Sequence, residues 1–74
     1  MTPQKLSERI GVWLTKNMDV QSLTYASLAE ASGLDATTIS TIARHGRDVR
    51  MSTFVVLCRA MKQDPTLVLK GLIK

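Results

Sequence analysis

Apolar residues recur at intervals of three and four along nearly the whole chain, which is the period of α-helices with one buried face. Polar residues that can cap a helix N-terminus precede these segments, namely Thr2, Thr24, Asp35 and Asp64. Glycines, which accept the left-handed backbone that often ends a helix, follow two of them. The pattern predicts helices only, because the one β-like run, "FVVLC", lies inside a helical repeat.

Five short helices account for this pattern. They are expected over residues 3 to about 16, 25–32, 36 to about 45, about 51–61 and 65 to about 73. Connections between them are short, and no repeat or low-complexity segment interrupts the chain. We therefore predict one all-α domain over residues 1–74, folded as a compact five-helix bundle.

The spacing also indicates which residues face the core. The expected inward positions are Leu6, Ile10, Trp13, Leu14, Leu28, Ala29, Ile39, Ile42, Met51, Phe54, Leu57, Cys58 and Met61. Among them, Cys58 is interpreted as a small core hydrophobe and not as a nucleophile, because no activating base accompanies it.

The third predicted helix has two chemically different faces. At about 100° per residue, Ile39 and Ile42 lie on one side. The opposite side carries Thr37, Ser40, Thr41 and Arg44. Short hydroxyl side chains let a helix approach a partner closely, exchange hydrogen bonds with bases or phosphates and pack a methyl on thymine. The alternative is an ordinary solvated face, although serine and threonine lower helix propensity relative to alanine.

The segment "SLAEASGLDATTISTI", residues 27–42, has the spacing of two helices joined by a tight turn. Small Ala29 permits close helix passage, and Gly33 follows at the turn. The wedge between the helices is filled by Leu28, Leu34, Ile39 and Ile42. Six compatible positions in one register predict a helix-turn-helix over about residues 25–45.

These residues resemble the lambda repressor/Cro-type, or xenobiotic-response-element-type, helix-turn-helix family over roughly residues 23–69. "LTYASLAEASGLDATTISTIARHGR" is similar to the family pattern L-T-Q-x-x-L-A-x-x-x-G-[VL]-S-x-x-x-I-S-x-[IW]-E-x-G-x-R, and "MSTFVVLCRAMKQDPTLVL" follows its fourth and fifth helices. The resemblance implies a five-helix DNA-binding domain, usually dimeric, whose third helix enters the major groove. By position it implies base-facing roles for Ala36, Thr37, Ser40 and Thr41.

The resemblance also implies phosphate contacts from the start of the second helix and from the region of the third helix and the loop after it, where the basic segment "RHGRDVR" lies. The residues assigned to them are Tyr25, Thr38, Arg44, His45, Arg47 and Arg50. Tyr25 stands where the family has glutamine, and Ala36 replaces a longer amide, which predicts fewer base hydrogen bonds and more methyl packing. The alternative for "RHGRDVR" is an ordinary basic loop in which Asp48 pairs with one arginine.

Charge is distributed unevenly along the chain, whose net charge is +4. Residues 36–59 carry four arginines against Asp48, or 4 − 1 = +3, whereas residues 1–35 carry 3 − 4 = −1. Such a distribution favours a polyanionic partner or, equally, serves solubility. A single cysteine, no apolar run of bilayer-spanning length and no signal peptide predict a cytoplasmic protein, and the resemblance implies a bacterial host cell. We expect no metal site, cofactor, small-molecule ligand, membrane contact or catalytic group.

The last two predicted helices carry more apolar residues than one buried stripe requires. The surplus assigned to a dimer interface is Val55, Val56, Leu67, Leu72 and Ile73; the alternative is that they wrap the core. A two-fold dimer would place two third helices about 34–36 Å apart. The sequence thus predicts a homodimeric, Cro-like repressor of phage or bacterial type bound to a palindromic double-stranded DNA operator. The alternative is an antitoxin or adaptor that uses the same fold to bind another protein.

Overall fold

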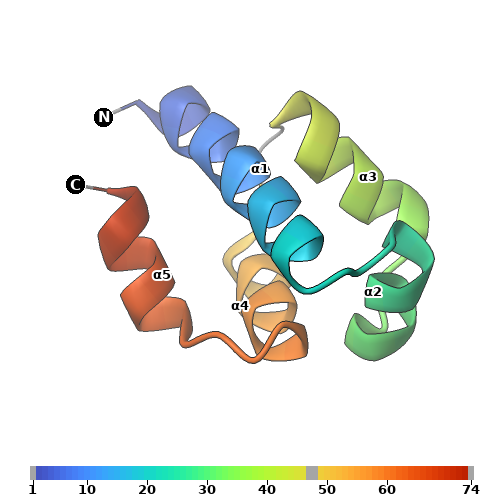
Figure 1. Cartoon of the computed structure of the whole chain (residues 1–74). Helices are drawn as coiled ribbons and strands as arrows, with labels where there is room; N and C mark the ends of the chain where they lie inside the picture. Colours follow the sequence, from blue (N-terminus) through green and yellow to red (C-terminus); the bar gives the residue numbers. More distant parts are fainter. Residues whose placement is uncertain (1, 47–48, 74) are drawn as a thin grey trace.

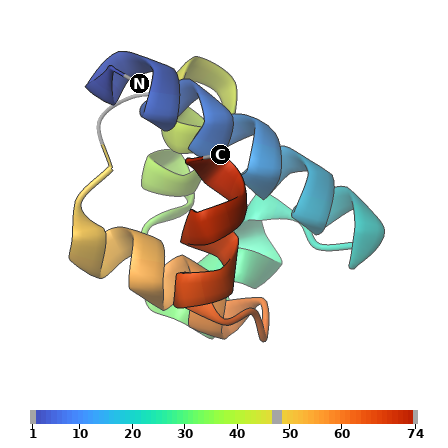
Figure 2. The ribbon, with the colours of Figure 1, turned by 90° about the vertical axis from the view of Figure 1, so that its left-hand side faces the viewer.

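The computed structural model describes residues 2–46 and 49–73, which form five helices and contain no strand (Figure 1). The helices are α1 (Pro3–Val20), α2 (Tyr25–Ser32), α3 (Ala36–His45), α4 (Met51–Ala60) and α5 (Pro65–Leu72). The prediction of five helices is confirmed, and their bounds agree to within a residue except at the end of α1. In space, α1 lies between α3 and α5, while α2 packs against α3 and α4 (Figures 1 and 2).

Helix α1 ends at Val20 and not at about residue 16 because its buried stripe continues for another turn. Ile10, Leu14 and Met18 follow one another at four-residue spacing, and all three are buried. Gln21 then ends the helix, and its side-chain Nε2 donates to the backbone oxygen of Met61 at 3.0 Å. The extra turn therefore connects α1 to the end of α4.

Side chains cap three helix N-termini as predicted. Thr2 caps α1 and the Asp64 carboxylate caps α5. At the start of α2, the side chains of Thr24 and Ser27 each accept the other's backbone N–H, forming a capping box. Asp35 occupies the cap position of α3, but this described residue makes no side-chain cap hydrogen bond, so that part of the prediction is wrong.

The core is formed by the inward faces of α1 to α4. Its buried apolar residues are Ile10, Leu14, Met18, Leu28, Ile39, Ile42, Phe54, Leu57, Cys58 and Met61. Met51 was expected among them but is 63% exposed, because it is the first residue of α4 and projects beyond the edge of the core. Helix α5 has no buried residue and covers the core with partly buried Val68, Leu69 and Leu72.

Helices α1 and α3 approach each other so closely that two glycines are required between them. A Cβ on Gly11 would lie 2.7 Å from the backbone oxygen of Ile42, and one on Gly46 would lie 2.9 Å from the Cα of Glu8. Gly46 also ends α3 with a φ of 54°, in the left-handed region. The same glycine therefore satisfies both a turn and a close helix contact.

Small side chains continue this contact along α1. Ser7, one turn before Gly11, is buried. Thr15, one turn after it, donates its hydroxyl to the backbone oxygen of Gly11 at 3.0 Å and lies 3.4 Å from that of Ala43. The face of α1 directed at α3 is thus a stripe of Ser, Gly and Thr, and this stripe fixes the distance between the two helices.

Replacing Gly11 with alanine is expected to lower the free energy of unfolding by about 1–3 kcal/mol, because the new methyl overlaps a backbone oxygen that cannot rotate away. Gly71→Ala is the matched control, since a Cβ there meets nothing within 4 Å. In α5 the same change should stabilise by about 0.5–1 kcal/mol through helix propensity. Urea denaturation measures both; equal effects of the two substitutions would contradict the close-contact interpretation.

Cys58 is fully buried in α4, which confirms its assignment to the core. Burial raises the pKa of its thiol from 9.0 to about 11, and the Asp64 carboxylate contributes to this shift. Since the folded chain holds the proton more tightly than the unfolded chain, the stabilisation is complete below pH 9 and is lost as the pH rises toward 11.

Between pH 9 and 11 the wild-type free energy of unfolding should therefore fall more steeply than that of Cys58→Ala, by about 1.4 kcal/mol per pH unit. Urea denaturation of both proteins at intervals across this range measures the difference. The alanine variant supplies the baseline, because it retains every other group that titrates there. Parallel curves would show that the thiol is not held neutral by the fold.

Candidate nucleic-acid interface

Helix α3 stands at one side of the molecule, and two contacts set its orientation. Fully buried Leu28 and Ile39 join it to α2, and the chain turns between the two helices at Gly33, whose φ is 76°. On its other flank, α3 packs against the small-residue stripe of α1 through Ile42. The face of α3 opposite these contacts is left open.

The open face of α3 carries the hydroxyl residues that the sequence places there. Thr37 and Thr38 are exposed, and Thr41 is partly exposed. Ala36 and Ser40 are also partly exposed. The amphipathic division of this helix is thus confirmed, whereas a base-facing role for these residues stays a prediction.

A shallow depression of about 310 Å³ joins this face to the start of α4. Thr37, Thr38 and Thr41 line one side of it, and Arg50 and Thr53 line the other. Val49 and Ile42 complete the lining. Three predicted contact residues of α3 and one predicted phosphate-binding arginine therefore share one hollow.

Sequence reasoning missed Thr53. It immediately precedes Phe54, which is buried, so its position on α4 points away from the core by about 100°. The helical period alone indicates this angular offset between Thr53 and the buried face of α4. The sequence does not indicate that the start of α4 and α3 line the same hollow, because this depends on the path of the chain between them.

Thr41 makes a hydrogen bond that limits what it can present. Its hydroxyl donates to the backbone oxygen of Thr37, one turn earlier, at 2.8 Å. A hydroxyl has one hydrogen, so Thr41 can offer a partner only oxygen lone pairs and a methyl group. Of the two ways in which the hydroxyl of Thr41 could bond to a partner, accepting a hydrogen bond is the one left open.

The basic residues predicted to bind phosphate are dispersed. Arg44 and His45 are exposed in the last turn of α3, where positive charge also favours the helix C-terminus. Arg50 is exposed at the N-cap of α4. Arg47 and Asp48 lie outside the described residues.

Tyr25 lies apart from this group. It is the first residue of α2, its side chain packs partly against the core, and it lines a second hollow with Lys16 and Asp19 of α1. The structure does not bring Tyr25 into the depression that contains Thr37 and Arg50. Its assignment to a phosphate contact stays a prediction.

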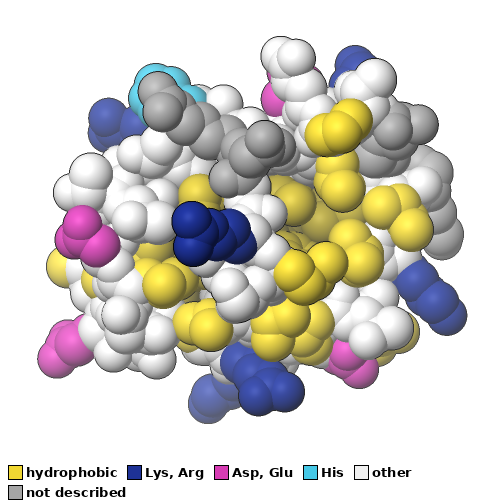
Figure 3. Space-filling model, turned by 180° about the vertical axis from the view of Figure 1, so that it is seen from behind, with side chains coloured by type: hydrophobic (Ala, Val, Ile, Leu, Met, Phe, Trp, Pro, Cys, Tyr) yellow, Lys and Arg dark blue, Asp and Glu magenta, His cyan; other side chains and the backbone are white. Residues whose placement is uncertain are grey.

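Of the five residues predicted to form a dimer interface, two line the groove between α5 and α1, and the other three do not. Hydrophobic side chains gather over α4 and α5 on the rear of the molecule (Figure 3). Val55 and Val56 of α4 are partly exposed, and Ile73, just after α5, is 53% exposed. Leu67 and Leu72 instead line a groove between α5 and α1.

Two further observations bear on the kind of site this chain carries. Within residues 2–46 and 49–73, no three His, Cys, Asp or Glu side chains converge as metal ligands would. None of the helices in these ranges is long and apolar enough to cross a membrane.

The hydroxyl-lined depression at α3 and α4 is the candidate interface, because it brings together Thr37, Thr38, Thr41 and Arg50. Comparison of the chain with protein-family models, and with curated proteins, found no match.

Proposed function

We propose that the protein is a sequence-specific DNA-binding regulator in which α2 and α3 form a helix-turn-helix of the lambda repressor/Cro type. Helix α3 enters the major groove with Thr37, Ser40 and Thr41 toward the bases, while Arg44 and Arg50 contact phosphates. The observation that carries the proposal is the single depression shared by the α3 threonines and Arg50.

The chemistry of this surface suits close approach to a duplex. Side chains of three or fewer heavy atoms allow the α3 backbone to lie deep in a groove that is about 12 Å wide. Arg50 lines the depression at the N-cap of α4 and is exposed, which supports a contact to a phosphate at the edge of the groove. Phosphate contacts set the register, and the few base contacts then select sequence.

A second copy would compensate for the small number of base contacts per chain. We assign the two-fold contact to exposed or partly exposed apolar residues of α4 and of the position after α5, namely Val55, Val56 and Ile73. Two α3 helices would then read two half-sites of a palindrome, about one helical turn of DNA apart. With this architecture the protein acts as a small cytoplasmic repressor that blocks an operator by occupying it.

Selection of bound sequences from random double-stranded DNA tests the function directly. Enrichment of an inverted repeat with half-sites about 10–10.5 base pairs apart is the expected outcome. A pool that stays random after repeated rounds at low salt would contradict a sequence-specific function. Repeating the selection with Val56→Glu distinguishes monomeric from dimeric reading, because only the dimer requires the repeat.

Arg50→Gln is expected to weaken binding to every DNA sequence alike, because an arginine on phosphate carries no sequence information. The slope of log affinity against log salt concentration should fall by about 0.9 for each lost phosphate contact. Arg59→Gln is the matched control, since Arg59 is an exposed arginine at the other end of α4. Anisotropy titrations from 50 to 200 mM salt measure both, in the salt range where such contacts are strongly screened. Equal slopes for the two variants would remove Arg50 from the phosphate contacts.

Two substitutions at Thr41 separate its methyl from its hydroxyl. Thr41→Val keeps the shape and the methyl, whereas Thr41→Ser keeps the hydroxyl. Because that hydroxyl donates to Thr37, we expect the valine variant to keep its site preference and the serine variant to lose about 1 kcal/mol at a thymine position. Competition between the selected site and its single-base variants measures this. If only Thr41→Val lost its preference for the selected site, the base contact would be made by the oxygen lone pairs of Thr41.

A further inference from the structure

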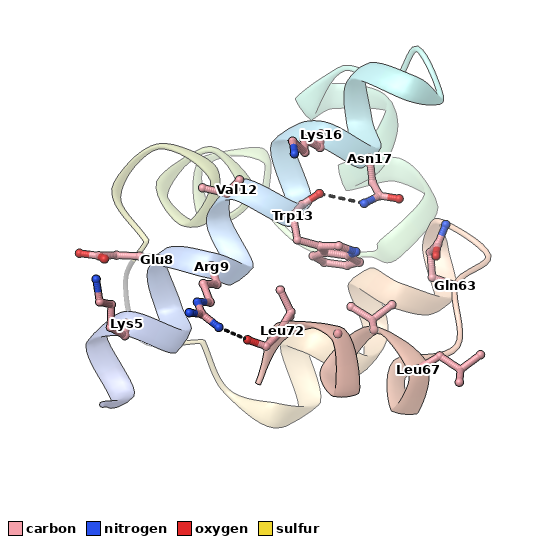
Figure 4. Close-up of a pocket in the computed structure, with 12 residues that line it drawn as sticks. Lys5, Glu8, Arg9, Val12, Trp13, Lys16, Asn17, Gln63, Leu67 and Leu72 are labelled. Carbon is pink, nitrogen blue, oxygen red and sulfur yellow. Dashed lines mark hydrogen bonds between the residues drawn. The ribbon is translucent and has the colours of Figure 1, made fainter. Parts of the chain in front are cut away.

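A groove of about 850 Å³ runs between α1 and α5 (Figure 4). Helix α1 lies between α5 and α3, so the groove is on the side of α1 that faces away from α3 (Figure 1). From Lys5 to Asn17, residues of α1 line it over about 18 Å, or more than three helical turns. Within this length the Arg9 side chain crosses from α1 to α5, where its Nη1 donates to the backbone oxygen of Leu72 at 2.8 Å (Figure 4). Between Arg9 and Asn17 the groove follows α1 for about 12 Å, or about two helical turns, which is enough to hold a short helix.

The inside of the groove is apolar. Trp13 points between the two helices, and Leu72 lies on the side of α5 (Figure 4). Val68 also lines the groove. Val12 and Leu67 stand on opposite sides and are 59% and 65% exposed. Exposed aliphatic side chains on both walls of a concave surface are the arrangement that receives the apolar face of an amphipathic helix.

The charges around the groove are mostly positive. Lys5, Arg9 and Lys16 line it along α1, against one carboxylate, Glu8. Three cations beside an apolar floor complement a segment that has acidic residues flanking its apolar stripe.

We propose that this groove binds an acidic amphipathic helix from another protein, with the apolar stripe on Trp13, Val12 and Leu67 and the carboxylates toward Lys5 and Lys16. The proposal goes beyond DNA binding and does not depend on it. Because α1 separates the groove from α3, the same chain can present the hydroxyl face of α3 and hold the helix at once.

A second copy of this chain is a poorer occupant. Two such grooves face to face would bring two sets of Lys5, Arg9 and Lys16 together, and like charges at an interface are unfavourable. An anionic membrane offers matching charge, but the apolar residues here line a hollow and not a projecting surface. Both alternatives are outcomes of the experiment.

Trp13 supplies the readout, since it is the chain's single tryptophan and lines the groove. The probe is a tryptophan-free helical peptide of roughly 14 residues, long enough to match the groove, with a leucine stripe at i, i+3, i+4 and i+7 and glutamates on both flanks. We expect it to shift the Trp13 emission to shorter wavelength in a saturable titration. A matched peptide with lysines in place of the glutamates should bind at least about tenfold more weakly.

Two exposed valines of α1 provide a matched pair of variants. Val12→Glu places a carboxylate in the groove and should weaken peptide binding by about tenfold or more. Val20→Glu adds the same charge at an 83% exposed position outside the groove and should leave the affinity unchanged. Circular dichroism is expected to be the same for both, because neither valine is buried.

A second pair repeats the test from the other wall. Leu67→Glu should weaken binding as Val12→Glu does, and Met51→Glu, at a similarly exposed position outside the groove, should not. The same titration with vesicles of phosphatidylcholine and phosphatidylglycerol, and with the protein alone at rising concentration, examines the other occupants.

Four results would overturn the proposal. The acidic peptide leaves Trp13 emission unchanged, or the lysine peptide binds equally well. Alternatively, anionic vesicles but not the peptide shift the emission, which assigns the groove to a membrane surface. Finally, a shift with protein concentration that Val12→Glu abolishes would assign it to a second copy. None of these results alters the outcome of the DNA selection, so the two functions fail independently.

Discussion

The close contact between the backbones of α1 and α3 determines how the open face of α3 and the groove between α1 and α5 are oriented. At Gly11 the two helices are so close that a methyl group would not fit. Gly46, the residue that ends α3, lies similarly close to the backbone of Glu8 in α1. The contact holds α3 with its threonine face outward. Helix α1 also packs against α5, so its two sides contact two different helices.

Local signals were sufficient to predict most of the helices. Thr24 and Asp64 cap helices, and Gly33 ends one, through hydrogen bonds and backbone angles that involve only residues nearby in the sequence. These caps and this turn could therefore be predicted from the local sequence. Predictions failed where a distant segment decides the outcome. Met18 extends α1 because a core is present to receive it, and Met51 is exposed because the core ends before it.

The residues of the candidate interface also differ in whether the local sequence or a distant segment determines their position. Its hydroxyl face could be predicted, because a helical period alone places Thr37 and Thr41 on one side of α3. That Arg50 and Thr53 line the same depression could not be predicted, because it depends on the path of the chain between α3 and α4. Gly11 shows the limit most clearly: a glycine inside a helix reads as a weak position, and only the packing reveals that it is required.

Helix α5 is attached to the rest of the molecule less firmly than any other helix. It has no buried residue. Partly buried apolar side chains pack it against the core, and Arg9 of α1 donates a hydrogen bond to the backbone oxygen of Leu72. Native-state hydrogen exchange should therefore resolve two classes of amides. Those at the centres of α1 and α3 exchange only when the whole chain unfolds, whereas those of α5 exchange through a local opening of lower free energy. An occupant held between α1 and α5 would merge these classes, making the last helix part of the cooperative unit.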